Sequence, residues 1–266
     1  VVNEIKMLRV IDKLRSISPI PIKRTLLAAH AIPVKYKKNK SKYIKIITNE
    51  LIPKVARENL ADYIDVFCEK GYFTVSETDK ILNYGVNYGL IPKVHTNQFN
   101  IIGGVKAAIN YNALSVDHLE LLDNNDIEAL KYSNAMCTTL PACSFFLGIP
   151  YAPVRLMMKN NLAVALASDF NPGSSPTNNM NFVVSLACIK MKMTPEEAIN
   201  AATINGACAM GVSDQLGSIS IGKKANLIIT KPLNHYYEIP YNFGNNIIEQ
   251  VIINGNKQKS WENLSF

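Results

Sequence analysis

Short apolar segments alternate with longer amphipathic segments along most of the chain. Six of the short segments have the length of β-strands, and they cover residues 22–27, 64–67, 91–95, 114–117, 135–139 and 163–168. The segments between them have the apolar spacing of helices, as in 43–58, 75–89, 124–133 and 153–159. This alternation predicts βαβ units that share one parallel sheet.

The pattern changes after the sixth predicted strand. A loop rich in turn residues, DFNPGSSPTNN, comes first, and two helices are expected after it, over 176–190 and from 195 to near 211. Thr194 as N-cap and Pro195 at the first helical position mark the start of the second helix. Two β segments follow, over 217–230 and 249–257, and Asn254-Gly255 predicts a tight hairpin turn.

Two arrangements accommodate six strand–helix units. An eight-stranded βα barrel needs two more strands than the six predicted. A doubly wound sheet tolerates six strands. However, no glycine-rich nucleotide-binding loop follows any predicted strand, which disfavours the doubly wound sheet. The opening VVNEIKMLRVIDKLR has helical spacing, and its first residue is Val1 and not Met, so we expect a helix entered partway through a longer protein. The prediction is an α/β fold, a TIM-type (β/α)8 barrel lacking its first strands over 1–212, with a small C-terminal β-rich appendage over 213–266.

Composition narrows the class of partner. The chain has 266 residues, of which 48% are hydrophobic and 18% charged, which is typical of a globular protein. No apolar run has the length that crosses a bilayer. Much of the net charge of +7 comes from KYKKNKSKYIK, interpreted as a solvated loop entering a helix. Five cysteines without a CxxC pair argue against a disulfide framework. We expect a cytoplasmic protein without a nucleic-acid or membrane partner.

Candidate chemistry gathers where the predicted strands end. Active sites of βα barrels lie at the C-terminal ends of the strands, and the polar residues at these ends are His30, Glu69, His95, Asp117, His118 and Asp169. Three of the four histidines are among them, and the fourth, His235, is expected to be structural. Glu69 is interpreted as a salt-bridge partner at the rim, and Asp117 as a residue that orients a neighbour.

Histidine and aspartate together suit a divalent metal such as zinc, because imidazole nitrogen and carboxylate oxygen are its usual non-thiolate ligands. Such a metal lowers the pKa of a bound water, and a nearby aspartate can then take and return the proton. His95 and Asp169 therefore form half of a metal site, with fewer donors than a catalytic ion needs.

Seven segments spread over the chain carry a family pattern. They are AHAIP (29–33), DVFCEKGYFT (65–74), SVDHLE (115–120), FFLG (145–148), DFNPGSSPT (169–177), MTPEEAINAATINGA (193–207) and IPYNFGNN (239–246). In content and order they resemble the C-terminal two-thirds of the imidazolonepropionase family, within the amidohydrolase superfamily. The superfamily's first strand carries a His-x-His pair that supplies two further metal ligands, and this pair does not occur in the sequence.

The resemblance implies hydrolysis of the cyclic amide of 4-imidazolone-5-propanoate to N-formimidoyl-L-glutamate, the third step of histidine degradation. It implies one zinc or iron ion per subunit and a subunit able to form a homodimer. By the same resemblance His95 and Asp169 are metal ligands, and Asp169 also transfers protons. His118 is implied as the second catalytic residue, and the implied substrate-binding residues are His30, Gln98, Asn171, Gly173 and Ser174.

Some positions depart from the family pattern. Thr96-Asn97 stand where the family usually has Ala-Asp, and Gln98 stands where some members have Glu. Glutamine cannot act as a base, so Gln98 is expected to bind the ring without transferring protons. Two alternatives stay open, namely another cyclic amidohydrolase or deaminase of the same superfamily, and a catalytically inactive fragment.

Overall fold

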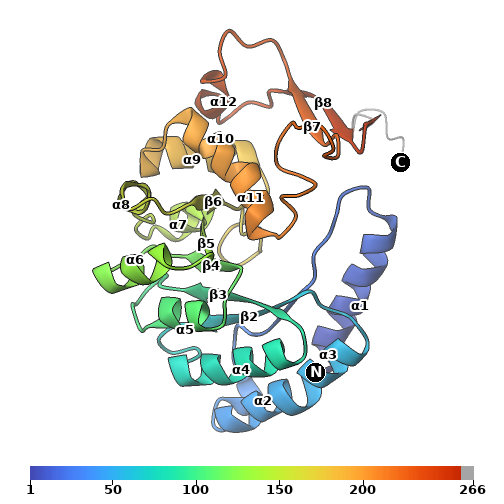
Figure 1. Cartoon of the computed structure of the whole chain (residues 1–266), viewed down its shortest axis with the longest axis vertical. Helices are drawn as coiled ribbons and strands as arrows, with labels where there is room; N and C mark the ends of the chain where they lie inside the picture. The colour runs from blue at the N-terminus through green and yellow to red at the C-terminus, as the bar shows by residue number, and fades with distance from the viewer. Residues whose placement is uncertain (259–266) are drawn as a thin grey trace. The chain divides into compact units, whose positions relative to one another are not determined.

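The computed structural model describes residues 1–258, which fall into two compact units (Figure 1). Among the described residues, the first unit contains Val1–Thr139 and Leu156–Ala163, and the second contains Leu140–Arg155 and residues 164–258. The predicted division at residue 212 stays a prediction, and 259–266 of the predicted appendage lie outside the described residues.

Six strands make up the main sheet, and their order in it follows the sequence, β1-β2-β3-β4-β5-β6. The strands are β1 (Thr25–Ala29), β2 (Tyr63–Cys68), β3 (Ile91–Thr96), β4 (Ser115–His118), β5 (Met136–Thr139) and β6 (Val164–Leu166). Neighbours from β1 to β5 pair in parallel. An order without reversal is that of a βα barrel, whereas a doubly wound sheet reverses at its switch point. The predicted fold class is confirmed, and each strand overlaps its predicted segment.

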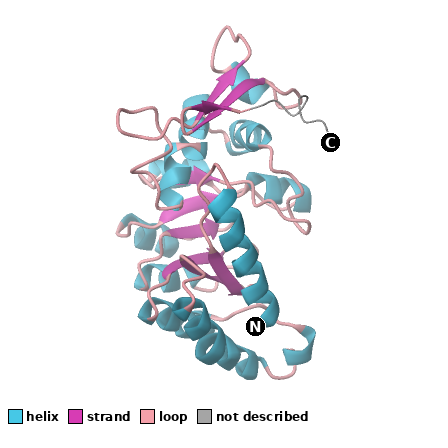
Figure 2. Cartoon of the chain, turned by 90° about the vertical axis from the view of Figure 1, so that its right-hand side faces the viewer, coloured by secondary structure: helices cyan, strands magenta, loops and turns pink. Residues whose placement is uncertain are grey.

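Helices of the first unit connect these strands, and Figure 2 shows them in cyan beside the magenta strands. They are α1 (Val2–Ile17), η1 (Val34–Tyr36), α2 (Lys40–Ile46), the π-helical turn η2 (Ile47–Leu51), α3 (Ile52–Arg57), α4 (Val75–Asn87), α5 (Gly104–Asn110) and α6 (Asn124–Lys131). α8 (Val154–Lys159) has residues in both units. Thr74 and Glu77 form a capping box that starts α4.

Packing of α4 against β2 shows how the core of the first unit is built. Ile81 and Leu82 of α4 are fully buried, as is Ile64 of β2. Burial of each such side chain stabilises the fold by about 1.5–3 kcal/mol. Gly85 lets the helix approach the strand closely, since a Cβ there would lie 2.6 Å from Ile64 Cγ2.

A buried arginine ties the N-terminal helix to the start of the sheet. Arg24 donates from its side chain to Asp12 of α1 at 2.8 Å and to the Asn59 carbonyl at 2.6 Å. Its Nε lies 3.3 Å from Asp62 Oδ2. These partners satisfy a guanidinium that burial would otherwise destabilise.

The second unit contains the remaining helices and a three-stranded antiparallel sheet, β7-β8-β9. Its further elements are α7 (Pro141–Leu147), α9 (Met180–Met191), α10 (Pro195–Ala202), α11 (Ile204–Ala209), β7 (Leu227–Thr230), α12 (Glu238–Tyr241), β8 (Ile248–Ile253) and β9 (Asn256–Lys257). The predicted hairpin turn is confirmed, because Asn254 and Gly255 join β8 to β9 with φ of 50° and 80°.

Several predicted boundaries were wrong. The helix predicted over 176–190 begins at Met180, because the Asn179 side chain accepts from the backbone of Asn181 and Phe182 and caps it there. The next helix begins after its predicted N-cap, Thr194, which forms a capping box with Glu197, but it breaks at Thr203 into α10 and α11. Of the strand predicted over 217–230, only Leu227–Thr230 is a strand.

Two further properties of the described residues bear on function. All five cysteines are free thiols. None of the helices within residues 1–258 combines the length and the apolar character needed to cross a membrane.

Candidate active site

A polar layer lies within the sheet of the first unit. Alternate residues of a strand share one face, and the parallel register places Asp65 beside Lys93 and Lys93 beside Ser115. The next row on this face contains Phe67, His95 and Asp117. Branched aliphatic side chains usually fill barrel interiors, whereas both rows on this face contain charged side chains. We call Asp65, Lys93, Ser115 and Asp117 the polar layer.

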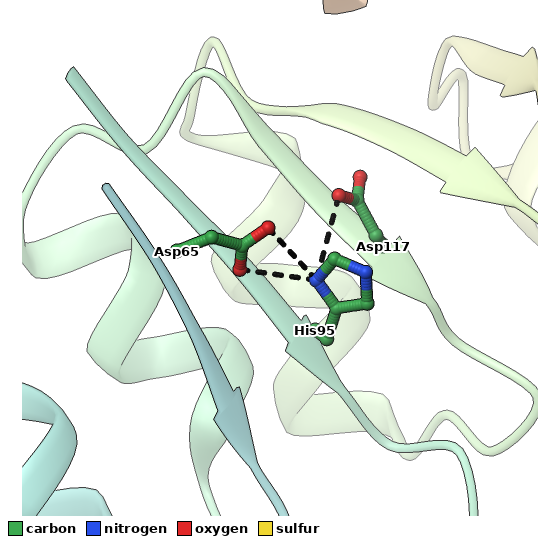
Figure 3. Close-up of side chains that lie close together, drawn as sticks. All are labelled: Asp65, His95 and Asp117. Atoms are coloured by element: carbon green, nitrogen blue, oxygen red, sulfur yellow. Dashed lines mark hydrogen bonds and ion pairs between the residues drawn. The ribbon is translucent and has the colours of Figure 1, made fainter. Parts of the chain in front are cut away.

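His95 lies between the two aspartates of this layer (Figure 3). Its Nδ1 is 3.0 Å from each carboxylate oxygen of Asp65 and 3.9 Å from Oδ2 of Asp117. Asp65 is 2% exposed, so this contact is shielded from water. One ligand atom from each of the three residues falls within a 4.8 Å group, which has the composition of a metal site.

Lysine and serine partners hold Asp117 in its ionised form. Ser115 Oγ donates to Asp117 at 2.7 Å, and Lys93 Nζ lies 4.0 Å from its carboxylate while donating to Ser115. Burial acts to raise the pKa of Asp117, but Lys93, His95 and the Ser115 hydrogen bond outweigh it and lower that pKa below its usual value. Asp117 thus has Ser115 and Lys93 as partners, and the orienting role expected for it stays a prediction.

Three of the predicted site histidines converge around Phe67. His30 stacks on the Phe67 ring at 5.4 Å between centroids, and the His118 ring lies 6.4 Å from it. The rings of His95 and His118 are 5.4 Å apart, and those of His30 and His95 are 6.5 Å apart. His30 is exposed, His95 is half-buried and His118 is buried, so burial increases from the first ring to the third.

His118 ends β4 in an unusual backbone conformation. Its φ is 86° and that of Leu119 is 63°, both in the left-handed region that non-glycine residues rarely adopt. Its Nδ1 lies 3.3 Å from Oε1 of Glu120, which is 4% exposed. Strain of this kind costs about 1–3 kcal/mol and persists where the surroundings fix it. The turn thereby holds the imidazole at the carboxyl end of the strand.

Glu69 anchors the loop that carries Gln98. Its Oε2 accepts from the backbone of Phe99 at 3.0 Å and of Asn100 at 3.3 Å. Its Oε1 accepts from the backbone of Lys70 at 2.9 Å and from Asn100 Nδ2 at 3.1 Å. The expected salt bridge at the rim was wrong, because within residues 1–258 this 1%-exposed carboxylate pairs with N–H groups and with no cation. Gln98 is buried beside this anchor, with 7% exposure.

The loop after β6, in the second unit, is held by its own hydrogen bonds. Asn171 Oδ1 accepts from the backbone of Gly173 and Ser174, both at 2.8 Å, and Asn171 Nδ2 donates to the Asp169 carbonyl at 2.6 Å. Ser174 Oγ donates to Asp169 Oδ2 at 3.3 Å. The loop therefore holds the Asp169 side chain in place, and the Asn171 amide is occupied by hydrogen bonds within the loop. Because Asp169 and His95 belong to different units, a metal shared between them stays a prediction.

Asp65 was missed as a candidate in the sequence. The C-terminal ends of the predicted strands do not include Asp65, because it lies inside the segment 64–67. A signal was present, since an acid inside the otherwise apolar and aromatic YIDVFC occupies a fully buried strand. A buried carboxylate needs a partner, and His95 on the neighbouring strand β3 is that partner.

Comparison with known proteins places this geometry in context. The model of the amidohydrolase family matches residues 99–257. A relative from Flavobacterium johnsoniae named imidazolonepropionase is 62% identical over 253 residues, which cover 95% of this chain and 62% of that protein. The chain thus spans 62% of the length of the first curated relatives it matches.

Solved structures share the fold at low identity. A guanine deaminase from C. acetobutylicum with bound guanine superposes with a TM-score of 0.73 and 18% identity, over 96% of this chain and 69% of the other. An adenosine deaminase from Xanthomonas campestris with bound zinc gives a TM-score of 0.70 and 16% identity, over 94% and 63% of the two chains. These similarities concern the fold alone.

Proposed function

The chain belongs to the amidohydrolase family, and from this we propose that it carries the part of a metal-dependent hydrolase that holds His95, His118 and Asp169. The proposed reaction opens the cyclic amide of 4-imidazolone-5-propanoate to give N-formimidoyl-L-glutamate, the third step of histidine degradation. The observation that carries this proposal is 62% identity over 253 residues to a protein named imidazolonepropionase.

The family implies a divalent metal, and the donors of this chain fit one. An imidazole from His95 and a carboxylate from Asp169 are the ligand types that zinc and iron accept. We propose one zinc or iron ion per subunit, completed by ligands beyond these two residues. Such an ion supplies an activated water and a polarised ring carbonyl when bound.

The residues of the chain divide the proton transfers between them. Water adds to the ring carbonyl carbon, its proton passes to the Asp169 carboxylate, and the carbon–nitrogen bond then breaks as Asp169 returns that proton to the leaving nitrogen. The Ser174 hydroxyl, 3.3 Å from Asp169 Oδ2, orients this carboxylate. His118 orients the water or the ring carbonyl from its fixed turn after β4.

The remaining residues bind the small-molecule substrate. We propose that the exposed His30 ring, supported by Phe67, and the buried Gln98 contact the imidazolone ring. Gly173 and Ser174 contribute from the loop after β6, where Asn171 would exchange a loop hydrogen bond for one to the substrate. A homodimer, a cytoplasmic location and the lack of nucleic-acid or membrane partners stay predictions.

A chimera tests the proposed reaction. The stretch of the Flavobacterium johnsoniae protein that this chain does not match is fused ahead of Val1, and the product is assayed with 4-imidazolone-5-propanoate, dihydroorotate, hydantoin and guanine. We expect ring opening of the imidazolone alone, and its loss in the matched His95→Ala chimera. Comparable turnover of any of the other three substrates would contradict the assignment.

A further inference from the structure

The contact between Asp65 and His95 has a consequence for the metal site. We propose that Asp65 is a positioning residue, which keeps the imidazole proton of His95 on Nδ1 and so presents Nε2 to the metal. The second half of this inference rests on the proposed function, which makes His95 a ligand. The first half concerns the chain alone.

Hydrogen-bond chemistry sets the direction of the proton. An ionised carboxylate can only accept, and both oxygens of Asp65 lie 3.0 Å from Nδ1 of His95. A bond at this distance therefore requires a proton on Nδ1. In a neutral imidazole with Nδ1 protonated, Nε2 carries the lone pair that binds a metal.

Asp65, and not Asp117, is suited to this task. The nearest carboxylate oxygen of Asp117 is 3.9 Å from Nδ1, beyond hydrogen-bond reach. Asp117 also accepts from Ser115 at 2.7 Å and lies 4.0 Å from Lys93 Nζ, so it already has a donor and a cation. Figure 3 shows the second ring nitrogen of His95 on the side of the ring opposite Asp65.

The same surroundings disfavour a metal on the Nδ1 side. The ammonium of Lys93 lies within ion-pair distance of Asp117, and a divalent cation added there would be repelled by it in a poorly solvated space. Asp65, His95 and Asp117 have the composition of a metal site. We infer that Asp65 instead supports His95, as carboxylates commonly do for metal-binding histidines.

Nitrogen NMR of the 266-residue chain tests the inference without an activity assay. Histidine is labelled with ¹⁵N, the His95 signals are assigned by their loss in His95→Gln, and spectra are recorded at pH 9 before and after zinc. In the wild type we expect the proton on Nδ1 without metal, and zinc to shift Nε2. In Asp65→Ala we expect a mixture of tautomers and an apparent zinc affinity lower by about 10–100-fold.

Two further variants keep the test decisive. Asp62→Asn removes the carboxylate that pairs with Arg24 at the start of the sheet, so it controls for lost stability and should leave the His95 tautomer unchanged. Asp65→Asn replaces the carboxylate at nearly constant volume, should Asp65→Ala not fold. It should populate the Nε2-protonated form, because an amide can also donate to Nδ1.

The outcomes separate this inference from the proposed function. A wild-type proton on Nε2, a tautomer unaffected by either Asp65 variant, or a zinc shift at Nδ1 would overturn the inference. If the tautomer follows Asp65 but zinc shifts neither nitrogen, the role of Asp65 in fixing the proton stands. If zinc also shifts neither nitrogen in the chimera, which carries the further ligands, it is the metal-ligand assignment of His95, and with it the proposed function, that fails.

Discussion

His118 sits in a backbone conformation that dictates how its role should be tested. Its φ of 86° is accessible to asparagine at lower cost than to most other residues. In the chimera, His118→Asn should therefore fold, keep its metal content and lower kcat by about 10²–10⁴-fold, because it removes a group assigned to the chemistry. Steady-state kinetics with metal analysis measures this. His235→Asn, in the tail, is the matched control with normal kcat, and metal loss in proportion to kcat would refute the assigned role.

Glu69 should be among the polar side chains that contribute most to stability. Glu69→Ala leaves the part-buried hydrogen bonds from the N–H groups of Phe99 and Asn100 without their acceptor, at about 1–3 kcal/mol each. We expect the free energy of unfolding in urea to fall by about 2–5 kcal/mol. Glu128→Ala is the control, since this side chain is 57% exposed and pairs only with Lys131 among the described residues, and its effect should stay within about 0.5 kcal/mol. Equal effects of the two variants would contradict the anchoring role.

Two buried thiols should be inert in the folded chain. Burial raises the pKa of Cys68 to about 11 and that of Cys137 to about 12. The thiolate is the reactive form, and at pH 8 only about 10⁻³ or less of either group is ionised. Iodoacetamide labelling followed by mass spectrometry should modify both only after urea is added, whereas the half-buried Cys208 labels first. Rapid native labelling of Cys68 would show that β2 is not packed as described.

At the scale of elements, replacing Gly104 by alanine should change stability in the direction opposite to that expected from helix propensity. Alanine normally stabilises a helix by about 1 kcal/mol relative to glycine. At Gly104 in α5, however, a Cβ would lie 2.7 Å from Thr96 Cβ and 3.1 Å from Cys68 Cβ. Gly104→Ala should thus lower the free energy of unfolding by about 1–3 kcal/mol. The melting temperature should fall with it. In α11, Gly206→Ala meets only the Ala201 carbonyl, at 3.7 Å, and should be neutral or stabilising.

Elements differed in how well the sequence predicted them, for physical reasons. The apolar run within 163–168 predicted a buried strand, because a strand covered on both faces is continuously hydrophobic. The short α5 and α7 were missed, since seven residues show too little periodicity. α10 ends at Thr203 because of the backbone conformation of that residue, and the sequence around Thr203 does not predict this conformation.

For the candidate site, strand ends predicted the convergence of His30, His95 and His118, because parallel strands end at one edge of a sheet. The partner of His95 could not be found in this way. Asp65 and His95 are 30 residues apart, and their contact depends on the register between β2 and β3. Register is a property of the assembled sheet and not of either segment.

At the scale of the whole molecule, the 266-residue chain should bind metal weakly and associate with itself. β1 stands at the end of the strand order with β2 as its partner, and an unpaired edge invites pairing with another chain. Two expected metal ligands are also lacking from the sequence. Light scattering should show species larger than 29.5 kDa, and metal analysis should show less than one ion per chain, with no hydrolysis at saturating zinc. Stoichiometric metal with turnover would contradict this expectation.

The polar layer beside His95 also bears on how this protein would respond to selection. Replacing a buried ion pair such as Lys93 and Asp117 by apolar side chains of similar volume is often neutral, or stabilises by about 1–4 kcal/mol. A library screened for heat resistance alone would therefore tend to fill this layer with aliphatic residues. A library screened for metal binding as well should retain Asp65, so the two selections would diverge first in the interior of the sheet and not on its surface.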